Sequence, residues 1–178
     1  YEARGKFNKA RAIRESMASS CVISYGGKHP LTCEAIESLV ALIERQGKAP
    51  ELIEPLLVQF YESWKSIHGA TRMVELRTVV LKICDKKESR GEMGQAIELL
   101  KATLNDIRAN TGDDATFNYG DILPLLEKLG ALYLGEGMQN DAINIFKRVV
   151  MIVENYMGND GDKIPSEACQ SMAKAQFY

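Results

Sequence analysis

The sequence predicts an all-α fold, a solenoid in which antiparallel helix pairs stack side by side. Three observations support this prediction. A glycine-led helix start recurs along the chain, apolar residues fall at helical spacing between the recurrences, and the composition suits one sizeable buried core. Because a single helical hairpin of this length cannot bury its apolar stripe alone, neighbouring hairpins are expected to stack.

The composition excludes several classes of protein. The chain has 178 residues, of which 46% are hydrophobic and 26% charged, so it is neither disordered nor collagen-like. Its formal net charge of −2 removes the bulk attraction on which non-specific nucleic-acid binders depend. No apolar run approaches the roughly 18 residues of a membrane-spanning helix, so we expect a soluble chain with no membrane span.

Four similar segments divide the chain. Each opens with a glycine and continues into a helix, and a second glycine 21 or 22 residues later ends that helix. The opening glycines, which are 42, 44 and 46 residues apart, are Gly5, Gly47, Gly91 and Gly137, and the closing ones are Gly27, Gly69, Gly112 and Gly158. A consistent internal period of this length is typical of helical repeat proteins.

This period predicts eight helices in one repeat domain, residues 1–178, truncated at both ends. The second helix of a pair stands alone in 1–27, complete pairs occupy 30–69, 70–112 and 116–158, and a first helix stands alone in 165–178. Pro30 and Pro165 each lie where a first helix begins, which suits the tolerance of proline at the first helical position. Because both end helices lack a partner, we expect end-to-end self-association of the chain.

Apolar stripes define the second helices of the pairs. They comprise Ala142, Ile145, Phe146, Val149, Val150 and Val153 in the last complete repeat, and Ala96, Leu99, Leu100, Thr103, Leu104 and Ile107 in the repeat before it. Gly130 on the preceding helix is expected beside Ala142, since small residues let two helix backbones approach.

Two repeats depart from this pattern. Leu52 stands at the position expected for alanine, and Pro50 and Pro55 lie near the same helix start, so we expect that helix to be kinked or to begin late, around Glu54. In the third repeat Asp85 and Lys87 replace small or apolar residues of the first helix. We expect this copy to be the least regular.

The sequence resembles the tetratricopeptide repeats of the kinesin-light-chain type over essentially the whole chain. The resemblance rests on the period near 42 residues, the Gly-Lys-x-x-x-Ala opening at Gly5, the Gly-x-x-His-Pro junction from Gly26 to Pro30, and the stretch from Leu129 to Tyr133. It implies a right-handed superhelix that serves as a scaffold or adaptor for protein–protein interaction. In such arrays the first helices of the pairs line a concave groove that holds a peptide.

The resemblance also implies which residues face that groove. They are Glu37, Ala41 and Glu44 in the second repeat, Leu81, Asp85 and Glu88 in the third, and Glu127, Ala131 and Leu134 in the fourth. Family members that clamp acidic peptides use Lys, Arg and Asn at these groove-facing positions. In this sequence none of those positions holds such a residue, although Arg45 and Lys128 flank the groove. A basic or apolar partner segment therefore suits these positions. The alternative is that the carboxylates only form the solvated face of exposed helices.

No pattern in the sequence predicts catalysis, a cofactor or a metal. His29 and Cys33 are four residues apart, but zinc needs three or four ligands and no second pair follows. His68 precedes Gly69 at a helix end, where we expect an imidazole to act as a helix cap. The four cysteines form no C-x-x-C pair and are expected to be reduced, mostly buried thiols, which favours a reducing compartment, by default the cytoplasm, with targeting to an organelle left open as the alternative.

The favoured function is therefore a non-catalytic interaction scaffold that binds a protein or peptide segment in its groove or through its exposed repeat ends. A structural spacer within a larger protein or assembly, with the groove covered by flanking sequence, is the alternative. An RNA-reading helical repeat is disfavoured, because such proteins need a basic track for the RNA backbone.

Overall fold

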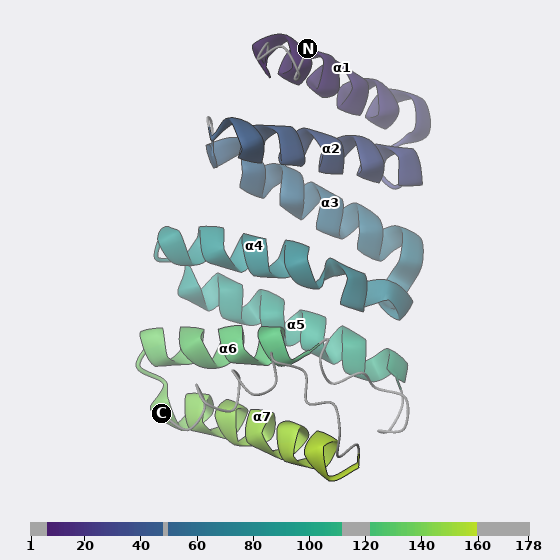
Figure 1. The fold of residues 1–178 in the computed structure, drawn as a ribbon. Helices are drawn as coiled ribbons and strands as arrows, with labels where there is room; N and C mark the ends of the chain where they lie inside the picture. Colours follow the sequence, from purple (N-terminus) through teal and green to yellow (C-terminus); the bar gives the residue numbers. More distant parts are fainter. Residues whose placement is uncertain (1–6, 48–49, 112–121, 160–178) are drawn as a thin grey trace. The chain divides into compact units, whose positions relative to one another are not determined.

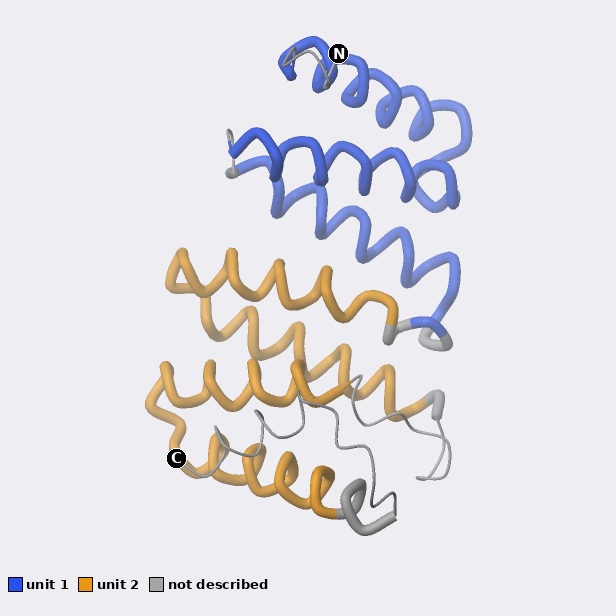
Figure 2. Tube along the Cα trace, viewed as in Figure 1, with its two compact units in different colours: residues 1–72 blue, residues 73–178 orange. Residues whose placement is uncertain are grey.

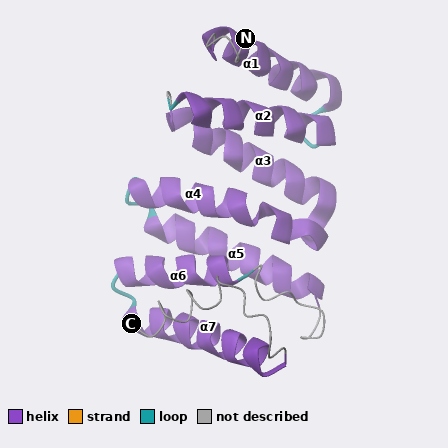
Figure 3. Ribbon diagram, in the orientation of Figure 1, coloured by secondary structure: helices purple, strands orange, loops and turns teal. Residues whose placement is uncertain are grey.

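The computed structural model describes residues 7–47, 50–111 and 122–159, and within these ranges the chain forms helices and no strand (Figures 1 and 3). The α-helices are α1 Phe7–Tyr25, α2 Pro30–Gln46, α3 Ile53–His68, α4 Arg77–Ser89, α5 Met93–Thr111, α6 Leu123–Gly135 and α7 Gln139–Asn159, and the 3-10 segments are η2 Pro50–Leu52 and η3 Gly69–Leu76. The predicted all-α class is confirmed. Seven of the eight expected helices are present, and the eighth, 165–178, lies outside the described residues.

The chain divides into two compact units, residues 1–72 and 73–178 (Figure 2). Unit 1 contains α1 to α3, and unit 2 contains α4 to α7. Each unit is described by itself below. The expected single repeat domain stays a prediction.

In unit 1, α1 packs against α2 and α2 packs against α3. The turn between α1 and α2 contains Gly26 with a φ of 85°, a backbone conformation that glycine adopts without steric cost. His29 caps α2, since its Nδ1 accepts the Leu31 N–H at 3.2 Å, and the Thr32 hydroxyl donates to the Gly26 carbonyl at 2.9 Å. His29 is therefore a junction residue, as its position before Pro30 suggests.

The start of α3 confirms the expected late helix. Residues 50–52 form the short 3-10 segment η2, and the α-helix begins at Ile53. Pro55 is then the third residue of α3, where its missing N–H removes no intrahelical hydrogen bond. The prediction that Leu52 fills the alanine position is wrong by one residue, because the buried stripe of α3 runs through Ile53, Leu57 and Phe60 while Leu52 is half-buried outside the helix.

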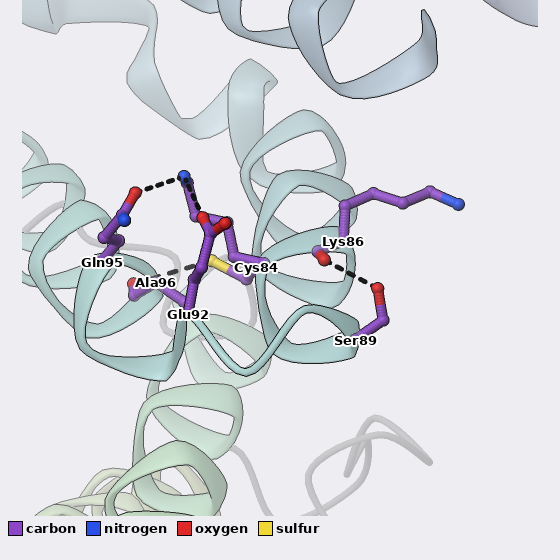
Figure 4. A network of polar contacts seen from close by, with 7 residues as sticks. Cys84, Lys86, Ser89, Glu92, Gln95 and Ala96 are labelled. Atoms are coloured by element: carbon purple, nitrogen blue, oxygen red, sulfur yellow. Dashed lines mark hydrogen bonds and ion pairs between the residues drawn. The ribbon is translucent and has the colours of Figure 1, made fainter. Parts of the chain in front are cut away.

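The third repeat is irregular, but at a different place from the one expected. Residues 69–76 form the 3-10 segment η3, in which Arg72 has non-helical angles of φ −121° and ψ 26°. Asp85 and Lys87, in contrast, lie within the regular helix α4. The Lys87 ammonium donates to Gln95 Oε1 at 2.8 Å and lies 3.4 Å from Glu92 Oε2, so partners at the start of α5 accommodate this charge (Figure 4).

The helices of unit 2 pack mainly against their neighbours in sequence. Helix α5 contacts both α4 and α6, α6 contacts α7, and α4 also contacts α6 directly. The three helices α4, α5 and α6 therefore all contact one another.

Small residues occupy the close crossings of unit 2. A Cβ on Gly130 of α6 would lie 2.7 Å from the Phe146 ring of α7, so the predicted small residue faces this ring; Ala142, also fully buried, lies one turn earlier in α7. One repeat earlier, Cys84 takes the place of Gly130, and its thiol lies 3.7 Å from the Ala96 carbonyl oxygen (Figure 4). Both crossings thus depend on a small side chain in the first helix.

Candidate partner-binding face

The α4–α6 face, defined here as Leu81, Asp85 and Glu88 of α4 together with Glu127, Lys128 and Leu134 of α6, is the candidate site. Residues 81, 85 and 88 follow the i, i+4, i+7 spacing that places side chains on one side of a helix, and 127 and 134 follow the same spacing on α6. Since α4 and α6 contact each other within unit 2, the two sets lie on neighbouring helices.

The side chains of this face differ in exposure. Asp85 and Glu88 are exposed, whereas Leu81, Glu127 and Leu134 are half-buried. Half-buried leucines beside carboxylates offer apolar surface and negative charge to a ligand. Such a combination suits binding by contact, and it holds no nucleophile paired with a base.

Lys128 joins the two helices of the face. Its ammonium lies 2.6 Å from Asp85 Oδ1 and 2.5 Å from Glu88 Oε2, and its side chain is 19% exposed against 63% and 44% for the carboxylates. Burial alone would lower the pKa of Lys128, but the hydrogen bonds to Asp85 and Glu88 outweigh it and raise the pKa. Two of the predicted groove carboxylates are therefore already bound to an internal cation.

This three-residue ionic contact was missed by the sequence reasoning, which placed Lys128 at the flank of the groove. Lys128 stands 40 residues after Glu88, whereas the opening glycines of the two repeats, Gly91 and Gly137, are 46 residues apart. The repeat period therefore does not predict this contact.

The second predicted set lies on α2 in unit 1. Glu37, Ala41 and Glu44 are all exposed and share one side of α2 by their i, i+4, i+7 spacing. The structure thus groups Leu81, Asp85, Glu88, Glu127 and Leu134 in one unit and places Glu37 and Glu44 in the other.

The described cysteines, Cys21, Cys33 and Cys84, are free thiols. Burial raises the pKa of Cys84 to about 12, and the nearby Lys128 opposes this shift without reversing it. Burial, aided by Glu34 and Glu37, also raises the pKa of Cys33. Both thiols are therefore protonated and poorly nucleophilic at neutral pH.

Among the residues that the structure describes, no three His, Cys, Asp or Glu side chains are arranged to hold a metal ion. None of the helices in those ranges combines the length and apolar character that crossing a membrane requires. Neither a protein-family model nor a curated protein matches the chain.

Proposed function

We propose that this chain is a non-catalytic interaction scaffold, built of tetratricopeptide-like helix pairs in a right-handed solenoid, whose α4–α6 face binds a segment of a partner protein. The observation that carries the proposal is the direct contact of the alternate helices α4 and α6, with half-buried leucines beside exposed carboxylates. Extended segments and helices dock on such helix-lined surfaces through alternate apolar anchors.

Equivalent backbone hydrogen bonds in unit 2 support the repeat interpretation. The Gly91 N–H donates to the Glu88 carbonyl at 2.9 Å, and 46 residues later the Gly137 N–H donates to the Leu134 carbonyl at 3.0 Å. The next residue in each turn also makes the same kind of hydrogen bond. The Glu92 N–H donates to the Lys87 carbonyl at 2.9 Å, and the Met138 N–H donates to the Tyr133 carbonyl at 2.8 Å. Two turns with the same bonds one period apart favour repeated helix pairs over an unrelated helical bundle.

The chemistry of the α4–α6 face favours an apolar segment that carries a basic residue. Its three carboxylates and one ammonium leave a formal charge of −2. Leu81 and Leu134 provide the apolar anchors, and a basic ligand residue competes with Lys128 for Asp85 and Glu88. Most of the affinity is therefore expected from the apolar contact, and the charge selects among apolar ligands.

A peptide-binding screen tests the proposal. Pools of apolar peptides carrying either Lys and Arg or Asp and Glu are compared on the wild-type chain, on Leu134→Gln and on Glu98→Gln. Glu98 lies on α5 and is 73% exposed, so its variant removes a charge away from the face. We expect binding from the basic pool, loss of about tenfold or more in Leu134→Gln, and no change in Glu98→Gln.

Absence of binding to either pool, or equal loss in Leu134→Gln and Glu98→Gln, would overturn the interaction proposal and leave the structural spacer as the function to test. Binding of the acidic pool alone would retain a scaffold but contradict the basic ligand class.

A further inference from the structure

We infer that Ser89, at the end of α4, is a site of phosphorylation, and that its phosphate increases the preference of the α4–α6 face for basic ligands. Ser89 is the single serine or threonine of the sequence with a lysine or arginine both two and three positions before it, here Lys87 and Lys86. Arg90 follows it directly. Protein kinases select their substrates by such charge patterns beside the acceptor hydroxyl. The local sequence therefore suits a kinase with an acidic substrate cleft.

The Ser89 hydroxyl lies where a kinase can reach it. Ser89 is the last residue of α4, and Ser89, Arg90 and Gly91 are all exposed. The hydroxyl donates a hydrogen bond within the same turn, to the Lys86 carbonyl at 2.7 Å (Figure 4). A kinase binds its substrate segment in an extended conformation, so this turn must open, and helix ends open at a low cost in free energy. Opening it presents Ser89 with both lysines on its N-terminal side.

The modification transfers the terminal phosphoryl group of a nucleoside triphosphate to Ser89. The bond between Ser89 Oγ and the phosphorus forms while the bond from that phosphorus to the bridging oxygen breaks, and the electron pair of the broken bond leaves with the nucleoside diphosphate. The hydroxyl proton passes to a carboxylate base of the kinase. The product is a phosphoserine with a charge of about −1.5 to −2 at neutral pH.

The phosphate is added beside the α4–α6 face. Ser89 follows Asp85 by four residues, so both side chains lie on the same side of α4, and it adjoins Glu88 in sequence. The formal charge of the face, which is −2 from three carboxylates and one ammonium, becomes about −3.5 to −4. More negative charge attracts a basic ligand residue more strongly. This consequence rests on the function proposed above.

The basic residues that mark the site also stabilise its product. Negative charge beside the carbonyl groups of a helix C-terminus is unfavourable, and a phosphate dianion has no proton to donate to the Lys86 carbonyl. Lys86, Lys87 and Arg90 place three positive charges within three residues of the phosphate, which offset both effects. We therefore expect the phosphorylated chain to keep its helical fold, as far-UV circular dichroism can check.

Phosphorylation of the native full chain tests the site. The chain is incubated with magnesium, ATP and the catalytic subunit of cyclic-AMP-dependent protein kinase, which selects basic residues two and three positions before a serine, and mass spectrometry measures the phosphate added. We expect one phosphate on the wild type, none on Ser89→Ala, and a rate about tenfold lower for Lys86→Gln. The matched controls, Ser66→Ala and Lys147→Gln, change exposed residues on α3 and α7 and are expected to react like the wild type.

Peptide binding tests the consequence of the modification. We expect the phosphorylated wild type to bind a basic apolar peptide several-fold more tightly than the unmodified chain at low salt. An uncharged apolar peptide is the control, and both forms are expected to bind it equally.

A native chain that takes up no phosphate, or takes it up equally in Ser89→Ala, would overturn the inference and leave the proposed function unaffected. Equal affinity of the two forms for the basic peptide would also overturn it. Modification of Ser89 without peptide binding by either form is a different result. It would contradict the proposed function and the regulation that depends on it, and would support Ser89 as the site of modification.

Discussion

Gly130 sets the approach of α6 to α7, because any side chain at this position meets the Phe146 ring. A Cβ would lie 2.7 Å from that ring, closer than packed carbon atoms come. We expect Gly130→Ala to destabilise the chain by about 1–3 kcal/mol, despite the gain in helix propensity from alanine. Urea denaturation followed by circular dichroism measures the effect.

Gly94→Ala is the matched control for this substitution. Gly94 lies in α5 with nothing within 4 Å of its Cβ position, so alanine there is expected to stabilise the chain by up to about 1 kcal/mol. The double variant Gly130→Ala with Phe146→Leu is expected to cost less than the sum of its parts. Equal effects of Gly130→Ala and Gly94→Ala would contradict the packing assigned to Phe146.

Because of Lys128, we expect the stability of unit 2 to fall at alkaline pH. Its pKa is raised above the ordinary value of 10.5, so its ion pairs stabilise the fold fully below that value and are lost as the pH rises through the raised pKa. We expect Lys128→Met to be less stable than the wild type at neutral pH and the difference to shrink above pH 10.5. Denaturation midpoints measured from neutral to alkaline pH provide the test.

A variant with Asp85→Asn and Glu88→Gln removes the partners of Lys128 and is expected to lose the same alkaline dependence. If the difference in stability between the wild type and Lys128→Met stays constant above pH 10.5, deprotonation of Lys128 does not weaken the fold, and this prediction is wrong.

At the scale of the elements, α3 shows how a proline specifies a helix start. Pro55 is its third residue, where a backbone N–H has no intrahelical partner, so Pro55→Ala is expected to change the stability by less than about 1 kcal/mol. Gln59→Pro, at an exposed site inside the same helix, is expected to cost about 3 kcal/mol or more. Thermal unfolding of the two variants compares them, and similar losses would place Pro55 in the interior of the helix, with a start at least one turn before Ile53.

The element boundaries show what local sequence signals determine. Glycines with positive φ at 47, 91 and 137 predicted the turns between paired helices, because few other residues adopt that conformation at low cost. The one-residue shift of the α3 stripe was not predictable from the period, since η2 takes up the extra residue. The 3-10 segment η3, with its non-helical angles at Arg72, likewise carries no sequence signal.

The candidate site was also predictable only in part, because part of it lies within one helix and part depends on two helices. Leu81, Asp85 and Glu88 lie in one α-helix, as the sequence pattern predicted, and their spacing places them on one side of it because that periodicity is local. The ionic contact of Lys128 with Asp85 and Glu88 joins two helices, so it depends on how α4 and α6 align. Periodicity within one helix does not contain that alignment.

At the scale of the whole molecule, the chain is nearly neutral, so any charge preference must come from local groups. Its formal net charge is −2, and the carboxylates of the α4–α6 face are spread over two helices. The field of these groups extends about 10 Å at 0.1 M salt, which covers the face but little beyond it. Electrostatic steering of a ligand by this face is therefore a short-range effect, which a change in salt concentration tests.

Lys128→Met and the double variant Asp85→Asn with Glu127→Gln change the charge of this face in opposite directions. Lys128→Met leaves Asp85 and Glu88 without their shared cation, so we expect it to bind a basic apolar peptide several-fold more tightly than the wild type. The double variant removes two of the three carboxylates of the face and is expected to bind more weakly, mainly through slower association.

Both differences in binding should diminish as salt rises from about 0.01 M to 0.15 M, since the Debye length falls from about 30 Å to 8 Å. Surface plasmon resonance at the two salt concentrations measures the rates, with Glu98→Gln as the control on α5. A basic peptide whose binding is indifferent to both variants and to salt would show that apolar contact alone holds the ligand, because no charged group of the face would then contribute to its recognition.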